Sequence, residues 1–195
     1  MKLYLAGPDV FLPDASAVGK IKLELCHRYG FSGLFPLDSE LNVPVSGALS
    51  KAIFESNIAM LDEADAILAN LTPYRGVSAD VGTVFEVGYG YARGKPVFGY
   101  SNVQTPFVER VRRFTGGAIV RGDDARLYAA DAFAVEDFES FDNLMIAEAL
   151  RATGMDVVVP EAATTDVWRD TSVFERALGM IRAKMAAHFR FAIAR

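Results

Sequence analysis

The stretch ADVGTVFEVGYG, residues 79–90, carries two carboxylates, Asp80 and Glu86, in otherwise apolar surroundings. A buried charge is costly unless it is paired or used, so acids are rare in apolar helices. On a helix, Gly82 and Gly90 each lie four residues from Glu86 and therefore share its face. Because glycine has no side chain, the pattern predicts a hollow over Glu86 that a ligand can enter. Paired carboxylates at such a place are suited to general acid and nucleophilic chemistry.

Simpler interpretations of the same residues stay open. Asp80 precedes the expected helix and suits an N-cap, which accepts hydrogen bonds from free N–H groups. Glu86 alone suits a solvated helix position, and Gly88 with Gly90 suits close packing of a helix on a sheet. Asn57 falls in the apolar stripe of the preceding helix, where an amide must find partners or lose stability. It either bonds to loop backbone or faces the same cavity as the acids.

Strands and helices alternate along the chain. Short apolar runs bounded by Gly and Pro predict buried strands, and helical spacing of apolar residues predicts the segments between them. The expected strands are residues 2–7, 31–38, 64–71 and 95–100, with a possible short fifth at 117–122. The expected helices are residues 15–29, 46–64, 82–93, 106–114, part of 141–154, and an amphipathic tail helix over 172–191.

This alternation predicts an α/β fold, a flavodoxin-like or Rossmann-like three-layer sandwich with a mostly parallel sheet of about five strands. Such sheets bind ligands beyond the carboxyl ends of their strands, which nominates loops 6–11, 36–44, 70–82 and 100–106. No linker-like stretch divides the chain, so we expect a single domain over residues 1–195, with 155–195 as a C-terminal helical extension.

Composition excludes several classes of protein. The 195 residues are 51% hydrophobic and carry a net charge of -5, which argues against nucleic acid, because its binders usually present a basic face. One cysteine and two distant histidines provide no metal-ligand spacing, so we expect no metal site. No signal peptide and no apolar stretch of about 20 residues is present, so we expect a cytoplasmic protein without a membrane span.

Several segments together resemble the nucleoside 2-deoxyribosyltransferase family. In order along residues 4 to 146, they are YLAGPDVF, FPLD, FESNIAMLDEADAILANLTPYRG, SADVGTVFEVGYG, GKPVFGY and DNLMI. The resemblance implies an enzyme of nucleotide salvage that moves 2-deoxyribose between nucleobases, with small-molecule nucleosides and nucleobases as its partners. The mechanism it implies resembles that of a retaining glycosidase, in which a carboxylate divides one displacement into two. Such chemistry needs neither a metal nor an organic cofactor.

The resemblance assigns three catalytic residues. It implies that Glu86 is the nucleophile, that Asp80 contacts the base or moves its proton, and that the Tyr4 hydroxyl positions the nucleophile. The alternative interpretation of Tyr4 is a strand tyrosine that is packed in the core. Some family members carry an aspartate where Asn57 stands; the amide can still position the sugar, but it cannot act as a base.

The resemblance also implies further substrate contacts. Gly7, Asp38 and Gly82 match positions at the substrate. Asn143 and Met145 match a segment that reaches the sugar of a neighbouring subunit, which implies a homo-oligomer with shared active sites. The alternative is that Asp142 or Asn143 simply caps a helix. The aromatic residues Phe11, Tyr74 and Phe107 lie in nominated loops and suit the walls of a base slot or ordinary packing, whereas Trp168 suits a packing anchor.

Two other functions compete with deoxyribosyl transfer. An N-glycosidase that hydrolyses nucleosides or nucleoside 5'-monophosphates would share the fold and Glu86. A non-catalytic nucleotide-binding module would share only the fold, since fold does not fix function. A dinucleotide-binding enzyme is set aside, because the first predicted strand ends in AGPDVF and lacks a Gly-x-Gly-x-x-Gly turn.

Overall fold

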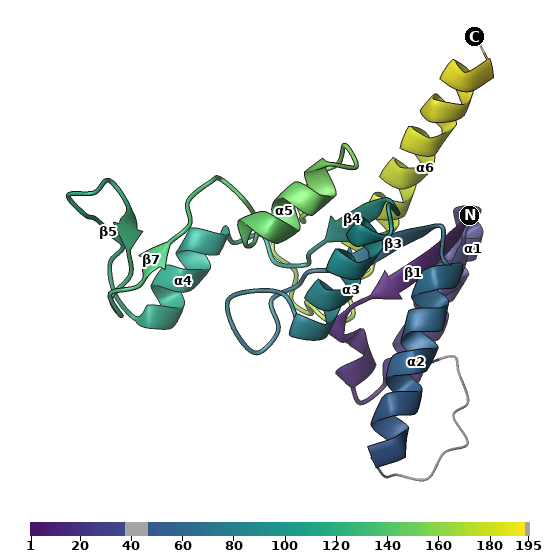
Figure 1. Ribbon diagram of the computed structural model, residues 1–195, viewed down its shortest axis with the longest axis horizontal. Helices are drawn as coiled ribbons and strands as arrows, with labels where there is room; N and C mark the ends of the chain where they lie inside the picture. Colours follow the sequence, from purple (N-terminus) through teal and green to yellow (C-terminus); the bar gives the residue numbers. More distant parts are fainter. Residues whose placement is uncertain (38–46, 194–195) are drawn as a thin grey trace.

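The computed structural model describes residues 1–37 and 47–193, without the side chains of residues 47–48 and 187–193. Figure 1 shows the elements, and their bounds are as follows. In chain order they are β1 (Lys2–Ala6), the 3-10 helix η1 (Pro8–Phe11), α1 (Ala15–Arg28), β2 (Ser32–Leu34), α2 (Gly47–Glu63), β3 (Ala66–Asn70), α3 (Val81–Ala92), β4 (Val97–Tyr100), α4 (Phe107–Thr115), β5 (Val120–Arg121), β6 (Leu127–Tyr128), β7 (Ala134–Val135), α5 (Leu144–Arg151) and α6 (Ser172–Ile193).

The main sheet confirms the predicted α/β fold. Its strands run in the order β2-β1-β3-β4, and every neighbouring pair is parallel. All five residues of β3 are buried, as expected for a central parallel strand covered on both faces. A single parallel bridge between Tyr100 and Val158 extends the sheet beyond β4.

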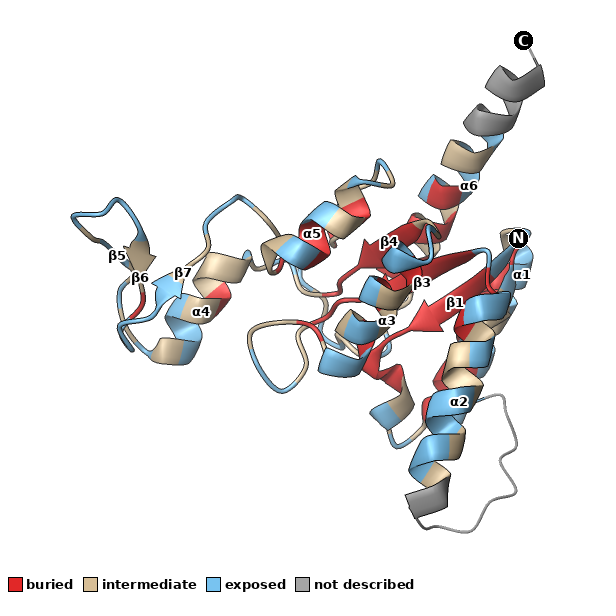
Figure 2. Cartoon of the chain, viewed as in Figure 1, coloured by how far each residue is buried: buried red, intermediate tan, exposed pale blue. Residues whose placement is uncertain are grey.

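Two apolar cores cover the two faces of the sheet, which Figure 2 shows as a buried layer between helices. Successive strand side chains point to opposite faces. Leu3 and Leu5 therefore join the core beneath α1 and α6, whereas Tyr4 and Ala6 join the core that includes residues of α2, α3 and α5. This alternation places the hydroxyl of Tyr4 on the α3 side of the sheet.

The possible fifth strand at 117–122 does not join the main sheet. It forms β5, which pairs antiparallel with β6 and, through β6, with β7 in a separate three-stranded sheet. The turn Gly122–Arg126, closed by a hydrogen bond from Gly122 N to Arg126 O, lets the chain double back at once. A short turn can join only antiparallel strands, because parallel pairing needs a long crossover. With α4, this sheet forms an arm, residues 107–141, that projects from the main body (Figure 1).

The C-terminal segment packs onto the sheet through the first half of α6. Its buried face includes Phe174, Leu178 and Ile181, with Met185 partly buried beside them, as the amphipathic pattern predicts. Phe174 also packs edge-on against Tyr100 of β4, with ring centroids 5.5 Å apart. Among the residues that the structure describes, none of the helices is long and apolar enough to cross a membrane.

Candidate active site

Tyr4 and Glu86 meet although they are 82 residues apart in the sequence. The Tyr4 hydroxyl donates to Glu86 Oε1 at 2.5 Å, and the Tyr4 side chain is fully buried. Gly90 allows this approach, since a Cβ there would lie 2.5 Å from Cγ1 of Ile67 in β3. The glycine thus brings α3 down onto the sheet, which lets Glu86, one turn earlier on the helix, reach the strand below.

The surroundings hold Glu86 in an unusual protonation range. The pKa of Glu86 is raised to about 7, chiefly by burial; the Tyr4 hydrogen bond lowers it, and the charge of Asp80 adds to the rise. Burial and the nearby Glu86 charge raise the pKa of Tyr4, so this hydroxyl keeps its proton and serves as a donor. A carboxylate with a pKa near neutrality is typical of a group used in catalysis.

A hollow of about 330 Å³ opens beside Glu86, between α2 and α3. This volume suits a small organic molecule. Apolar side chains dominate its wall, and its lining residues are Ser50, Ile53, Phe54, Asn57, Ile58, Leu61, Gly82, Phe85 and Glu86. Gly82 opens this hollow as the sequence predicts, but Gly90 does not, because Ile67 and Val97 fill the space over it.

Asn57 lies in the wall of this hollow with an unused acceptor. Its Oδ1 is buried and has no hydrogen-bond partner among the described residues. A buried acceptor without a donor costs roughly 1–3 kcal/mol. A donor on a bound molecule, such as a hydroxyl, would remove this cost.

Asp80 is the N-cap of α3, which confirms the simpler of its two interpretations. Its Oδ2 accepts from Thr83 N at 3.0 Å and from Thr83 Oγ1 at 3.3 Å. The carboxylate does not line the hollow, yet its charge raises the pKa of Glu86. Capping therefore accounts for its place in the fold and leaves it within electrostatic range of Glu86.

Comparison with known proteins identifies the family behind this geometry. A family model described as nucleoside 2-deoxyribosyltransferase matches residues 3–145. This chain belongs to that family. A solved 2-desoxiribosyltransferase from Leishmania mexicana is 30% identical, with a TM-score of 0.63, over 93% of this chain and 97% of its own. The deoxyribosyltransferase likeness thus extends past the family model into the C-terminal segment.

Two curated relatives are also similar. An uncharacterised protein from Schizosaccharomyces pombe is 29% identical over 181 residues, 85% of this chain and 86% of that protein. A putative 2'-deoxynucleoside 5'-phosphate N-hydrolase from Thermofilum pendens is 35% identical over 102 residues, 50% of this chain and 65% of its own. The protein is accordingly an enzyme of the deoxyribosyltransferase family that acts on nucleosides, by transfer or by the related N-deoxyribosyl cleavage.

The remaining predicted substrate residues of this deoxyribosyltransferase family member lie elsewhere. Gly7 starts η1, where a Cβ would lie 2.6 Å from Asp9 Oδ2, so close packing explains this glycine. Asn143 caps α5, since its Oδ1 accepts from Met145 N at 3.0 Å, and Met145 is 74% exposed. None of these three residues lines the hollow at Glu86. Asp38 lies outside the described residues.

The loop aromatics do not wall this hollow. Phe11 stacks on Tyr74 with ring centroids 5.4 Å apart, and Trp168 meets Tyr74 edge-on at 6.0 Å. Phe107 of α4 lies beside the guanidinium of Arg110. Packing therefore accounts for these contacts. The exposed apolar side chains at the hollow are instead Ile53, Phe54 and Phe85.

Sequence analysis missed a buried polar network on the other face of the sheet. Lys22 Nζ lies 2.7 Å from Asp9 Oδ2 and donates to Tyr100 Oη at 2.7 Å, while Asn70 Nδ2 donates to the Asp9 carboxylate. The signal was present: Lys22 stands between Val18 and Cys26 in the inner stripe of α1, where an unpaired lysine would be costly. The network fixes the start of η1 to β3 and β4.

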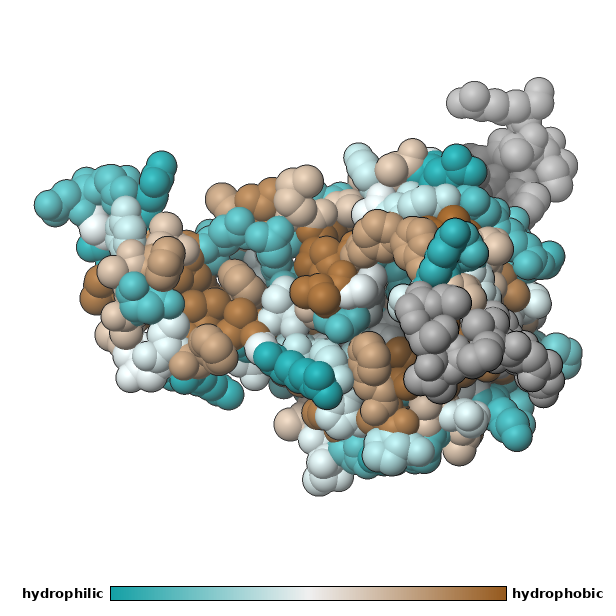
Figure 3. Space-filling model, turned by 60° about the horizontal axis from the view of Figure 1, so that its bottom comes forward, coloured by the Kyte–Doolittle hydropathy of each residue, from teal (hydrophilic) through white to brown (hydrophobic). Residues whose placement is uncertain are grey.

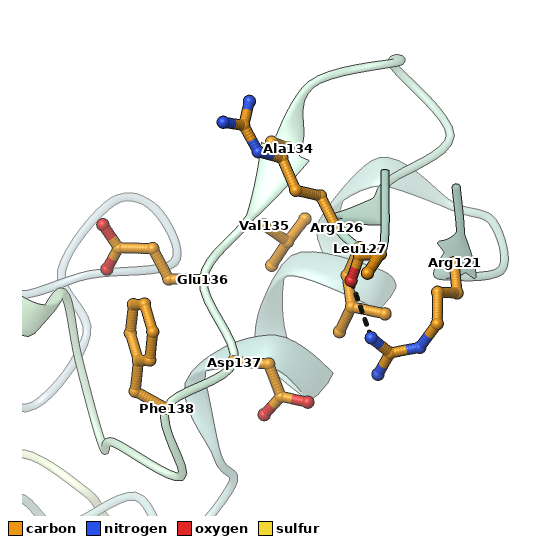
Figure 4. A pocket seen from close by; sticks show the side chains of 9 residues that line it. Arg121, Arg126, Leu127, Ala134, Val135, Glu136, Asp137 and Phe138 are labelled. Atoms are coloured by element: carbon orange, nitrogen blue, oxygen red, sulfur yellow. Dashed lines mark hydrogen bonds between the residues drawn. The ribbon is translucent and has the colours of Figure 1, made fainter. Parts of the chain in front are cut away.

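A second hollow, of about 480 Å³, lies in the arm (Figure 4). Its wall includes Arg121, which donates to Ala125 O at 2.7 Å, and Glu136. The Glu136 carboxylate is engaged in the fold, because it accepts from Leu144 N at 3.0 Å at the start of α5. This hollow is larger than the one at Glu86, but it lacks a carboxylate held by a buried hydroxyl. Figure 3 shows apolar side chains on the surface of both the arm and the main body.

Proposed function

We propose that this protein transfers 2-deoxyribose between nucleobases through a covalent glycosyl ester on Glu86, as a cytoplasmic enzyme of nucleotide salvage. The observation that supports this most is the Glu86 carboxylate beside the hollow, bound by the buried hydroxyl of Tyr4 at 2.5 Å. A nucleophile needs one oxygen held and the other free. Tyr4 holds Oε1, which leaves Oε2 for the sugar.

The reaction has two displacements. In the first, Glu86 Oε2 attacks the anomeric carbon, the carbon–nitrogen bond breaks, and its electron pair goes to the departing base, which takes a proton that Asp80 relays from solvent. In the second, a nitrogen of an acceptor base attacks the same carbon, Glu86 leaves, and Asp80 takes back a proton. The carboxylate charge stabilises the oxocarbenium-like transition state of each step. The Tyr4 hydrogen bond lowers the pKa of Glu86, which favours its ionised form, and it orients the carboxylate.

The lining of the hollow supports a free nucleoside as the substrate. A 5'-phosphate calls for Arg, Lys or a free helix N-terminus at the site. The start of α3 reaches the hollow at Gly82, but the Asp80 carboxylate caps this helix end. None of the described residues that line the hollow is Arg, Lys or His. The orphan acceptor of Asn57 suits a sugar hydroxyl instead. Hydrolysis of the N-glycosidic bond of a 2'-deoxynucleoside 5'-phosphate, the activity in the name of the Thermofilum relative, is the alternative.

Incubation of deoxyinosine with and without adenine tests transfer against hydrolysis. Transfer predicts that deoxyadenosine forms and that hypoxanthine release accelerates when adenine is present. Equal release of hypoxanthine in both reactions, with free deoxyribose and no deoxyadenosine, would establish hydrolysis. A parallel reaction with deoxyinosine 5'-monophosphate should be slower, and a faster one would show that a phosphate is bound.

Asn57→Ala should raise the KM for the nucleoside about tenfold, because one hydrogen bond from the sugar is lost. The value of kcat should change less, since this contact is present before and during reaction. Asn102→Ala is a matched control: Asn102 Oδ1 is also buried and orphaned, but Asn102 does not line the Glu86 hollow. Equal effects of the two substitutions on KM would contradict the assignment of Asn57 to the substrate.

We also propose a homo-oligomer in which Asn143 and Met145 complete the active site of a neighbouring subunit. Met145 is highly exposed and both residues are absent from the hollow of their own chain, which supports a role outside that chain. Mixed oligomers of Glu86→Gln and Asn143→Ala subunits should regain activity that neither variant has alone, because some sites then combine one intact residue from each. A mixture with only the sum of the separate activities would contradict shared sites.

A further inference from the structure

Asp142 is a fully buried carboxylate that no substrate role explains. Its side chain has no exposed surface, and it does not cap α5, because Asn143 is the N-cap of that helix. Glu136 satisfies the next N–H of the same helix start. Its one local contact is the N–H of Asn143, which donates to Asp142 Oδ1 at 2.8 Å. A carboxylate buried this completely needs further strong partners.

The partners of Asp142 converge on the peptide before Asp80. Asp142 Oδ1 accepts from Ser78 Oγ, and Asp142 Oδ2 accepts from Ala79 N at 3.0 Å. These bonds span 64 and 63 residues of sequence and fix the two residues that precede Asp80 in the β3–α3 loop. Since Asp80 is the next residue, these bonds also fix its backbone, from which the carboxylate side chain extends.

Arg110 holds Asp142 from the arm side. Its Nη2 lies 3.4 Å from Asp142 Oδ2 and donates to Phe141 O at 2.5 Å, while Nη1 donates to Thr105 O at 3.2 Å. The guanidinium is itself buried and lies over the ring of Phe141, 4.4 Å from its centroid. With a cation on one side and the loop on the other, the carboxylate has a single position.

We propose that Asp142, acting through Ser78 and Ala79, is a positioning residue for Asp80 in departure of the base. The inference rests on the proposed function, in which Asp80 gives a proton to the leaving nitrogen. Glu86 reaches Tyr4 from a later turn of α3 and keeps its own support from the strand below. Loss of the Asp142 contacts should therefore impair protonation of the base more than attack by the carboxylate.

Asp142→Asn tests this with two substrates. The amide keeps the shape but has one acceptor oxygen instead of two, so the loop end is released. With deoxyinosine, kcat should fall about tenfold or more, and KM should change little. This fall is smaller than the full contribution of a general acid, because Asp80 itself is still present. With 7-methyl-2'-deoxyguanosine, whose base already carries a positive charge and departs without a proton, kcat should stay near that of the unmodified protein. Asp80→Asn should show the same substrate dependence, and more strongly.

A double substitution gives a second test of whether Asp142 acts through Asp80. Asp80→Asn with Asp142→Asn should reduce kcat no further than Asp80→Asn alone, because residues that act through one another are not additive. Ser78→Ala, which removes one bond and leaves the carboxylate, should give a smaller loss with the same substrate dependence. If Asp142→Asn does not fold, Ser78→Ala replaces it in the comparison of the two substrates.

Thr153→Val is the matched control for loosening of α5. Its hydroxyl ties the other end of this helix to Val97 O of β4 at 2.8 Å and has no contact with residues 78–80. It should lower stability without a dependence on the leaving base. Equal losses of Asp142→Asn on both substrates, or additive effects with Asp80→Asn, would overturn the positioning role. Absence of base release by the unmodified protein would instead refute the proposed function itself.

Discussion

Glu86→Gln should lower turnover of deoxyinosine by roughly 10⁴-fold or more, as expected when a covalent nucleophile is removed. Glutamine has almost the same shape, and its amide oxygen can still accept from Tyr4. The variant should therefore stay folded and should still bind a nucleoside. Steady-state kinetics with the purified variant provide the measurement, and a turnover near that of the unmodified protein would eliminate the nucleophile assignment.

The same substitution should stabilise the protein in alkaline solution. The pKa of Glu86 rises from 4.5 to about 7 in the folded protein, so the native state binds the proton more tightly than the unfolded chain. Stability is then lost as the pH rises between these two values, and the loss is complete above the upper one. Glutamine avoids this loss, and its unfolding free energy at about pH 8 should be higher by up to about 3 kcal/mol. Chemical denaturation at acid and alkaline pH measures the difference, which should vanish at low pH.

A covalent adduct gives direct proof of the nucleophile. A 2-fluoro-deoxynucleoside should leave its sugar on the protein. Fluorine slows the second displacement more than the first, so the ester on Glu86 accumulates. Intact-protein mass should rise by the mass of the fluorinated sugar, and peptide mapping should place it on Glu86. An adduct on another residue, or on Glu86→Gln, would contradict the mechanism.

Tyr4→Phe should have the second-largest effect, and it should change the pH profile. Loss of a hydrogen bond to a charged group costs about 1.5–3 kcal/mol, which corresponds to a roughly 10- to 100-fold fall in rate. In the unmodified protein, kcat/KM should rise as the pH passes about 7 and Glu86 loses its proton. The Tyr4 hydrogen bond lowers the pKa of Glu86, so its removal should move this rise to higher pH.

Tyr89→Phe is the control for Tyr4→Phe. Tyr89 also lies on α3 and donates to a carboxylate, Asp62 Oδ1, at 2.9 Å, but it has no bond to Glu86. It should change neither the rate nor the pH profile. An unchanged profile for Tyr4→Phe would show that the hydroxyl does not control the protonation of Glu86.

Short-range patterns were enough to predict most of the frame. The apolar runs that became β1, β3 and β4, and the helical spacing that became α1, α3 and α6, reflect periodicities within a few residues. Capping is equally local, which explains why the sequence indicated an N-cap as one of the two interpretations of Asp80. The run at 117–122 misled because the sequence shows that a strand forms but does not show which partner it finds.

The glycines of residues 79–90 also show that a local pattern does not reveal what a residue packs against. Gly82 and Gly90 are equivalent neighbours of Glu86 on a helical wheel, yet one faces the hollow and the other faces Ile67. Spacing along a helix fixes which residues share a face. What that face meets depends on how the helix lies on the sheet, and this is set by the packing of both cores.

By itself the sequence determined the alternation of strands and helices and the spacing of Asp80 and Glu86, because both depend on neighbours along the chain. The family resemblance implied that the Tyr4 hydroxyl positions Glu86, with core packing as the alternative, and the tertiary structure shows this hydrogen bond from a fully buried side chain. The tertiary structure alone decided that the acceptor of Asn57 is left unused and that Asp142 fixes the loop before Asp80. These contacts join side chains far apart in the sequence. Their geometry follows from how α3 and α5 pack on the sheet, which no local pattern encodes.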